Sequence, residues 1–243
     1  MAAKEHYDNH LASFYEWMVG DFEAKQKEQQ DFFERNGIKP LQNKIAIDLG
    51  SGHGLQSIAL AKLDFAVKAV DFNGHLLDRL RFRGKGFQIE VFQNDLLSEE
   101  NFNEQAEVIV CMGDTLAHLE SGDQIRLLLE RCFKCLANNG KLILSYRDYN
   151  AELIDTQRFI PVRSDEDKIL TCFLEYDEDK VKVTDLLYER VNGQWIQKVS
   201  SYFKVRITKC IIEELVTDAG FKIIKNELMN RMNYLIAEKP NPS

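Results

Sequence analysis

The stretch Asp48-Leu49-Gly50-Ser51-Gly52-His53-Gly54 decides the fold of this chain. It ends a short apolar run at residues 44–49 and precedes a helical pattern at residues 54–63. Glycines between a strand and a helix let the backbone turn sharply and approach a ligand closely, because they have no Cβ. In doubly wound α/β sheets such a turn lies at the carboxyl edge of the strands, where ligands bind. We therefore expect a ligand site at residues 48–54.

The sequence around this turn alternates strand-like runs with helical periodicity. We predict strands at residues 44–49, 66–72, 87–94, 107–112 and 141–147, and helices that include residues 54–63 and 122–136, with a helix exit at residues 138–140. Strands that alternate with helices imply right-handed βαβ crossovers and a parallel sheet covered on both faces. The expected fold class is a doubly wound, Rossmann-like α/β domain.

A different pattern begins near residue 168. Three long strands are expected at residues 168–177, 180–191 and 194–207, with a tight hairpin at Asn192-Gly193. Thr208 then favours a helix that ends at Gly220, followed by strands at residues 221–228 and 233–238. We divide the chain into an N-terminal helical lid (1–40), a core (41–150), an antiparallel β cap (151–207) and the remainder of the core (208–243).

The glycine spacing distinguishes two classes of cofactor. The dinucleotide fingerprint is G-x-G-x-x-G, but here the third glycine, Gly54, comes one residue early and Leu55 takes its place. S-adenosylmethionine has no pyrophosphate to bind, and its amino-acid end carries a carboxylate and an ammonium group. We expect Asp48 to act on the ammonium, directly or through water, and N–H groups of the turn to meet the carboxylate.

Two further acidic residues follow successive strands. Asp71 ends the second predicted strand, where a carboxylate can accept both ribose hydroxyls, and Asp95 follows the third, where it can accept from an adenine amino group. A single acid at a strand end is usually a turn former or a helix cap. Three of them, beginning with the glycine turn, favour S-adenosylmethionine as the cofactor.

With these motifs, residues 44–238 resemble the class I S-adenosylmethionine-dependent methyltransferases. The resemblance implies a seven-stranded, mostly parallel sheet whose last strand is antiparallel, with S-adenosylhomocysteine as the product. It also implies a cofactor site made of Asp48, Gly50, Ser51, Gly52, Gly54, Asp71, Phe72, Asp95, Leu96 and Met112.

The segment after the fourth strand faces the transferable methyl group in that family. Here it reads Cys111-Met-Gly-Asp-Thr-Leu-Ala-His-Leu119, which is not the Asn/Asp-Pro-Pro-Tyr/Phe motif associated with amides and nucleobase amines. It is similar to the glycine N-methyltransferase group, as are Tyr146-Arg147-Asp148-Tyr149, the segment 18–21 and the β cap. This resemblance implies N-methylation of a small, amino-acid-like acceptor.

Carried over by position, Arg147 would hold a substrate carboxylate, since its guanidinium binds carboxylates in a bidentate way. Tyr7 and Gly113 would line the pocket. Asp114 or His118 would take a proton if the amine does not arrive unprotonated. Alternatively, Arg147 could pair structurally with Asp148 or another acid, and His118 could be a helix-start or packing residue.

Two departures from that group leave the acceptor open. Asp114 replaces a neutral Asn and adds a negative charge near any substrate carboxylate. The stretch at residues 160–162 lacks the tyrosines expected at the matching cap positions.

The composition restricts the classes of partner that we expect for this chain. The net charge of −8 disfavours a nucleic-acid substrate, despite a local basic patch at residues 79–85. The five scattered cysteines fit a reducing, cytoplasmic setting, and Cys132-x-x-Cys135 is interpreted as buried helix rather than a metal site. The first residues lack a signal-peptide core and no apolar run is long enough to cross a membrane, so no membrane partner is expected.

Besides a small-molecule substrate, we consider a homo-oligomer. Two alternatives to a methyltransferase stay open, a non-catalytic S-adenosylmethionine-binding regulator and a nucleotide-cofactor oxidoreductase.

Overall fold

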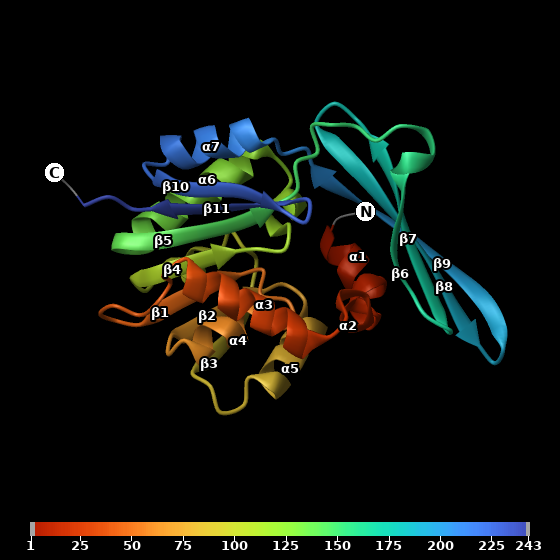
Figure 1. Ribbon diagram of the computed structural model, residues 1–243, viewed down its shortest axis with the longest axis horizontal. Helices are drawn as coiled ribbons and strands as arrows, with labels where there is room; N and C mark the ends of the chain where they lie inside the picture. Colours follow the sequence, from red (N-terminus) through yellow and green to blue (C-terminus); the bar gives the residue numbers. More distant parts are fainter. Residues whose placement is uncertain (1–2, 242–243) are drawn as a thin grey trace.

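The computed structural model describes residues 3–241, which form two β-sheets with a helical segment between them (Figure 1). The larger sheet has seven strands in the order β10-β11-β5-β4-β1-β2-β3. Strands β1 to β5 pair in parallel, whereas β11 is antiparallel to both β5 and β10. The expected seven-stranded sheet with an antiparallel last strand is confirmed. The strands are β1 (Ile45–Leu49), β2 (Ala66–Asp71), β3 (Ile89–Gln93), β4 (Ala106–Cys111), β5 (Leu136–Tyr146), β10 (Lys222–Met229) and β11 (Met232–Glu238).

Helices cover both faces of this sheet because alternate strand residues are apolar on each side. Ile47 and Ile109 belong to the cluster that packs under α6 (Gly122–Cys135) and α7 (Lys209–Asp218). Their neighbours Ala46 and Val108 pack under α3 (Phe22–Arg35) and α4 (Leu55–Lys62). Helix α5 (Gly74–Arg83) packs beside α4. The central strands are therefore buried on both faces, as a parallel sheet requires.

The capping residues predicted for α7 are confirmed, whereas the end predicted for α6 is not. Thr208 accepts a hydrogen bond from the N–H of Ile211 at the start of α7, and Gly220 has φ +100°. Helix α6 ends at Cys135, so the exit expected at residues 138–140 was wrong, and those residues belong to β5. Cys132 and Cys135 are buried free thiols on α6.

The smaller sheet is an antiparallel cap of four strands, in the order β6-β7-β8-β9. They are β6 (Phe159–Ser164), β7 (Lys168–Tyr176), β8 (Lys180–Val191) and β9 (Gln194–Val205). Asn192 and Gly193 form the predicted hairpin with positive φ values. The sequence missed β6, because it is short and contains Pro161, which a sheet tolerates on an edge strand.

Of the N-terminal helices, the first three lie between the two sheets, whereas α3 lies on the face of the larger sheet (Figure 1). They are α1 (Ala3–Asn9), η1 (Leu11–Ser13), α2 (Tyr15–Val19) and α3; the short 3₁₀ turns η2 (Glu99–Phe102), η3 (Thr115–His118) and η4 (Asp155–Arg158) come later in the chain. Leu11 and Phe14 pack against Leu170 and Leu187 of the cap. Within residues 3–241, no helix is long and apolar enough to cross a membrane.

Candidate functional site

The glycine turn after β1 is shaped by close contacts that only glycine permits. Gly50 and Gly54 have φ values of +77° and +101°. A Cβ on Gly50 would lie 2.7 Å from the hydroxyl oxygen of Thr115, and a Cβ on Gly54 would overlap the side chain of Leu80 on α5. Gly50 therefore lets η3 approach the turn, and Gly54 lets α4 begin against α5.

Asp48 of β1 connects this strand to helix α4, on the other side of the turn. Its side chain is buried and accepts a hydrogen bond of 2.5 Å from the Ser57 hydroxyl. Burial raises the pKa of Asp48 to about 7, although the Ser57 hydrogen bond opposes the shift. The carboxylate is not part of the cavity wall, so its action on a ligand ammonium stays a prediction.

Most N–H groups of the turn already have partners. Gly50 and Ser51 donate to the carbonyl of Val70, and Gly54 donates to that of Ser51. Gly52 donates to Asp71 over 2.8 Å. The first N–H groups of a helix lack intrahelical partners, and Leu55 and Gln56 at the start of α4 line the cavity. The N–H groups at the start of α4 are thus freer to bind a ligand carboxylate than those of the turn.

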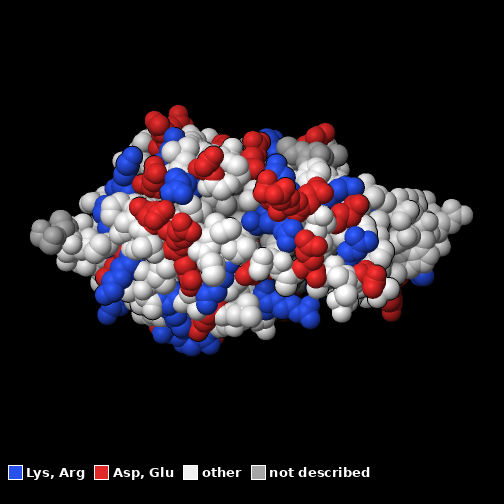
Figure 2. Space-filling model, turned by 90° about the horizontal axis from the view of Figure 1, so that it is seen from above, with Lys and Arg blue, Asp and Glu red and all other residues white. Residues whose placement is uncertain are grey.

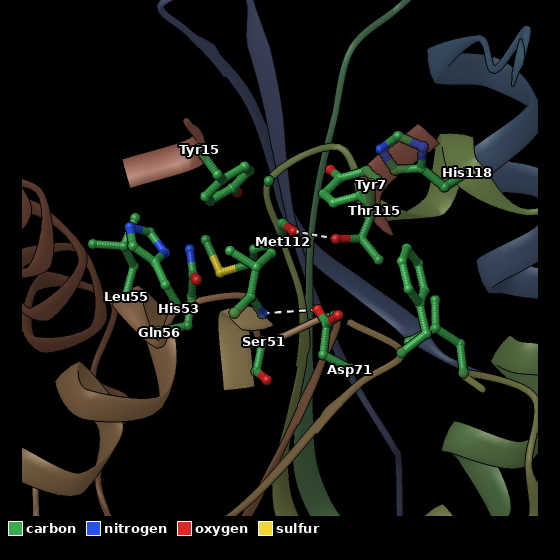
Figure 3. A pocket seen from close by; sticks show the side chains of 16 residues that line it. Tyr7, Tyr15, Ser51, His53, Leu55, Gln56, Asp71, Met112, Thr115 and His118 are labelled. Atoms are coloured by element: carbon green, nitrogen blue, oxygen red, sulfur yellow. Dashed lines mark hydrogen bonds between the residues drawn. The ribbon is translucent and has the colours of Figure 1, made fainter. Parts of the chain in front are cut away.

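A cavity lies above the turn (Figure 3). Its floor comes from the core, and Tyr7 and Tyr15 of the lid cover it. The expected residues that line it are Gly50, Ser51, Gly52, Asp71, Phe72, Leu96 and Met112 for the cofactor, Tyr7 and Gly113 for the substrate, and His118. Asp48 and Gly54 lie outside its wall, as do Asp114 and Arg147. Asp95 lines an adjoining cavity that shares Phe72 and His118 with the first.

Asp71 is the anionic group of the cavity. It is 7% exposed and accepts hydrogen bonds of 2.8 Å from the N–H groups of Gly52 and Asn73. Burial raises its pKa above the usual aspartate value, whereas these N–H donors oppose the shift. Asp71 is therefore held at the end of β2 by the glycine turn itself.

Asp114 forms a buried ion pair with the cap. Its carboxylate lies 2.5 Å from the ammonium of Lys204 on β9, and it accepts hydrogen bonds from the Tyr149 hydroxyl (2.6 Å) and the N–H of Arg147 (2.9 Å). Burial raises the pKa of Asp114, but the Lys204 charge and these donors outweigh it, so the pKa stays below the usual value. An ionised carboxylate with every partner in place is a poor proton acceptor. The geometry thus contradicts the expectation of a free base at this position.

His118 lies on the wall of both cavities and is uncharged near neutral pH. Burial is the main reason that its pKa falls to about 3, with the Lys204 charge adding to the effect. Its ring stacks on Tyr202 of the cap at 5.6 Å and meets Tyr7 edge-on at 5.6 Å. Its Nδ1 atom is buried and has no hydrogen-bond partner among residues 3–241.

Arg147 follows β5 with an exposed side chain. The alternative pairing with Asp148 is not formed, because Asp148 accepts from the N–H groups of Asn150 (2.8 Å) and Lys209 (3.2 Å). Within residues 3–241, the guanidinium takes part in no ion pair. It is therefore available to an anionic ligand, although it does not reach the cavity wall in this structure.

The sequence missed several residues of the cavity, among them Tyr15, His53, Gln56 and Thr115. Burial raises the pKa of Tyr15 to about 12, so its hydroxyl stays protonated. Its ring meets that of His53 edge-on in the wall of the cavity. The one feature of the sequence that could have indicated Tyr15 as a cavity residue is its spacing of eight residues, about two helical turns, from Tyr7.

Comparison with known proteins agrees with this geometry. Residues 46–140 match the family model described as "Methyltransferase domain". A glycine/sarcosine N-methyltransferase of Parasynechococcus marenigrum is 26% identical over 133 residues, which are 54% of this chain and 47% of that protein. That of Aphanothece halophytica is 25% identical over 158 residues, 60% of this chain and 57% of that protein. The chain thus spans about half the length of the curated relatives it matches.

Solved structures share the fold over nearly the whole chain. A methyltransferase from Clostridium acetobutylicum has a TM-score of 0.74 at 14% identity, covering 98% of this chain and 97% of that one. The CcbJ methyltransferase of Streptomyces caelestis has a TM-score of 0.80 at 14% identity, covering 96% and 98%. Residues 46–140, which contain the glycine turn, thus match a methyltransferase domain, and the whole chain shares its fold with S-adenosylmethionine-dependent methyltransferases of known structure.

Proposed function

We propose that this chain transfers the methyl group of S-adenosylmethionine to an amine of a small, amino-acid-like molecule. One observation carries the proposal. The cavity above the glycine turn has the Asp71 carboxylate on one side and runs to Gly113 and His118 on the other. A ligand with a hydroxylated ribose at one end and a reactive group at the other fits this arrangement.

The residues present suit that cofactor. Asp71 would accept the ribose hydroxyls, and Asp95 in the adjoining cavity would accept from the adenine amino group. The start of α4, at Leu55 and Gln56, would bind the carboxylate of the amino-acid end. When bound, the cofactor supplies a methyl group already activated by positively charged sulfur. The protein's contribution is then to align the reactants and exclude water.

The wall next to Gly113 supports an acceptor that arrives as a neutral amine. Neither polar neighbour is a strong base, since His118 has a pKa of about 3 and Asp114 is paired with Lys204. The lid residue Tyr7 meets both Phe72 and His118 edge-on and separates the cavity from solvent. Positioning and desolvation of the amine, rather than removal of its proton by a side chain, are what these residues provide.

The charge balance around Asp114 supports an acceptor that carries a carboxylate. The negative charge that replaces the neutral Asn is cancelled by Lys204 at 2.5 Å. Arg147, whose backbone N–H binds Asp114, adds an unpaired cation near the same place. The relatives named above act on glycine and sarcosine, and another fold neighbour is a sugar N-methyltransferase. Arg147 favours the amino-acid-like class.

The test is release of S-adenosylhomocysteine with paired acceptors that differ only in a carboxylate, such as an amino acid and the corresponding simple amine. We expect turnover with the carboxylate-bearing member. Arg147→Met should raise its KM about tenfold or more, with cofactor affinity unchanged. Arg126→Met, which removes an exposed arginine elsewhere, is the control.

Unchanged kinetics in Arg147→Met would remove the anchor role. Cofactor binding without release of S-adenosylhomocysteine from any amine, amino acid or hydroxylated acceptor would instead favour a regulatory binding protein. Calorimetry that detected NAD but not S-adenosylmethionine would overturn the proposal in favour of an oxidoreductase.

A further inference from the structure

His53 lies within the glycine turn, at the end of the cavity opposite His118 (Figure 3). It is 3% exposed and belongs to the cavity wall. Its ring is held edge-on by Tyr15 of α2 at 5.1 Å and by Phe22 of α3 at 5.2 Å. Within the described part of the chain, residues 3–241, its ring nitrogens form no hydrogen bond. A buried polar side chain that the protein leaves without a partner requires an explanation.

The cavity wall contains no permanent cation that could pair with an anionic ligand. Among residues 3–241, no lysine or arginine lines this cavity. Arg83 lies over the Phe22 ring at 4.2 Å instead, and its charge is paired with Glu16 at 2.5 Å. Figure 2 shows lysine and arginine side chains spread over the surface of the core, interspersed with acidic ones. A carboxylate buried in the cavity is therefore unfavourable unless some other group supplies a positive charge.

In the surroundings that the protein supplies, His53 is uncharged near neutral pH. Burial is the main reason that its pKa falls to about 4; the Arg83 charge adds to this shift and the Glu16 charge opposes it. An opposite charge within a few ångströms of a histidine favours its protonated form. A carboxylate placed beside His53 would thus raise its pKa again, and the imidazole could become the missing cation.

We propose that His53 takes up a proton when S-adenosylmethionine binds and pairs, as an imidazolium, with the carboxylate of the ligand's amino-acid end. The inference rests on the cofactor site proposed above, which puts that end at the start of α4, where Leu55 and Gln56 line the same wall. The proton comes from the solvent and returns to it when S-adenosylhomocysteine leaves, because the product carries the same carboxylate. Binding and release of the cofactor are then coupled to pH.

Two other carboxyl groups near the turn also titrate and have to be separated from His53. Burial raises the pKa of Asp48 to about 7, so contact with the ligand's ammonium would release a proton from it. Burial raises the pKa of Asp71 as well. The quantity that reports on His53 is therefore the difference between the wild type and His53→Gln, whose amide can still form hydrogen bonds but does not take up a proton.

The test is titration calorimetry of the full chain with S-adenosylmethionine in buffers of different ionisation enthalpy, which counts the protons taken up per ligand bound. If the carboxylate restores the ordinary histidine pKa of about 6.5, the wild type should take up about 0.7 of a proton more than His53→Gln at pH 6. At pH 8 the difference should vanish. The affinity of the wild type relative to the variant should correspondingly rise about fourfold from pH 8 to pH 6.

Two controls isolate the carboxylate and the histidine. The ligand 5′-methylthioadenosine keeps the ribose and the adenine but lacks the amino-acid end, so the wild type and His53→Gln should take up equal numbers of protons with it. His75→Gln replaces an exposed histidine of α5 and should behave as the wild type does. The histidine side-chain ¹⁵N spectrum of the wild type at pH 6 needs no variant, and one resonance should move to the imidazolium position when S-adenosylmethionine is added.

Equal proton uptake by the wild type and His53→Gln with S-adenosylmethionine would overturn the proposal. A difference that persists with 5′-methylthioadenosine would also overturn it, because the carboxylate would then not be its cause. A wild-type chain that does not bind S-adenosylmethionine at all would instead disprove the cofactor site itself, and the role of His53 with it.

Discussion

At the scale of single residues, the ion pair of Asp114 and Lys204 changes how the site is understood. Asp114 has φ +70° and is 3% exposed, and Lys204 is 9% exposed. Burying two charges is unfavourable unless they are paired and hydrogen-bonded. Tyr149 and the Arg147 N–H complete that requirement. The pair therefore joins the core to the cap, and its two charges cancel each other.

Lys204→Met should lower the free energy of unfolding by about 3–5 kcal/mol, because Asp114 loses its buried cation. The pH dependence of the stability should also become weaker. In the wild type the pKa of Asp114 is depressed, so the pair's contribution is present above the pKa of an unfolded aspartate and is lost as pH falls through the lower folded value. In the variant the cation that lowers this pKa is gone and burial is opposed only by the Tyr149 and Arg147 donors, so less stability should be lost as pH falls. Denaturant unfolding between pH 3 and pH 8 measures both effects.

Two variants serve as controls for that measurement. Asp114→Asn combined with Lys204→Met should recover most of the lost stability, since no unpaired charge remains. Lys198→Met removes an exposed ion-paired lysine of the same strand and should change stability by less than about 1 kcal/mol. A Lys204→Met protein as stable as the wild type would contradict the role of the pair.

Gly50→Ala should reduce the affinity for S-adenosylmethionine at least about tenfold. The new Cβ would meet Thr115 and would also hold alanine at φ +77°, a conformation that costs about 1–2 kcal/mol. Titration calorimetry measures the effect. Gly122→Ala is the control, because no atom lies within 4 Å of a Cβ at that position. Equal affinity in both variants would show that the turn tolerates displacement.

At the scale of elements, helix α1 is attached to the cap by one buried histidine. His6 lies 2.8 Å from the Ser200 hydroxyl and 3.1 Å from the Asp185 carboxylate, and its ring stacks on Tyr202 at 4.2 Å. Asp185 also accepts from the Cys172 thiol at 3.0 Å. Because Tyr7 follows directly and covers the cavity, the contacts of His6 hold the lid over the site.

His6→Ala should therefore loosen the lid. We expect faster hydrogen–deuterium exchange over residues 3–19 with the core unchanged, and an affinity for S-adenosylmethionine reduced by about tenfold, since each lost hydrogen bond is worth about 1 kcal/mol. His75→Ala removes an exposed histidine of α5 and is the control. Exchange at the wild-type rate would show that the apolar contacts of Leu11 and Phe14 are sufficient by themselves.

At the scale of the whole molecule, the cavity is assembled from three parts of the chain. The glycine turn and Asp71 come from the core, Tyr7 and Tyr15 from the lid, and Tyr202 and Lys204 of the cap support His118 and Asp114 from behind. A ligand that contacts the lid and the core together stabilises their closed arrangement. Ligand binding should consequently be visible in global unfolding.

S-adenosylmethionine at a hundred times its dissociation constant should add about 2.7 kcal/mol to the free energy of unfolding. For a chain of this length that corresponds to a rise in Tm of roughly 5–10 °C. S-adenosylhomocysteine should act similarly and NAD should have no effect. Differential scanning calorimetry provides the measurement, and a shift with NAD alone would argue against the cofactor assignment.

The sequence by itself determined the fold class and the cofactor class, and it predicted the edge of the sheet on which the cavity lies. Strand and helix periodicity, and the spacing of Gly50, Gly52 and Gly54, are local properties that can be detected along the chain. Asp71 was identifiable because it ends a strand next to that turn, and parallel strands bring their ends to one edge.

Only the tertiary structure decided what the remaining polar residues do. Asp114 was read as a base because nothing near it in sequence indicates Lys204, ninety residues away. The neutral state of His118 depends on burial under Tyr202 and Tyr7, and the place of the lid depends on a histidine that meets a cap strand. Ionisation and burial are set by charges and surfaces brought together from distant parts of the chain, which sequence spacing does not encode.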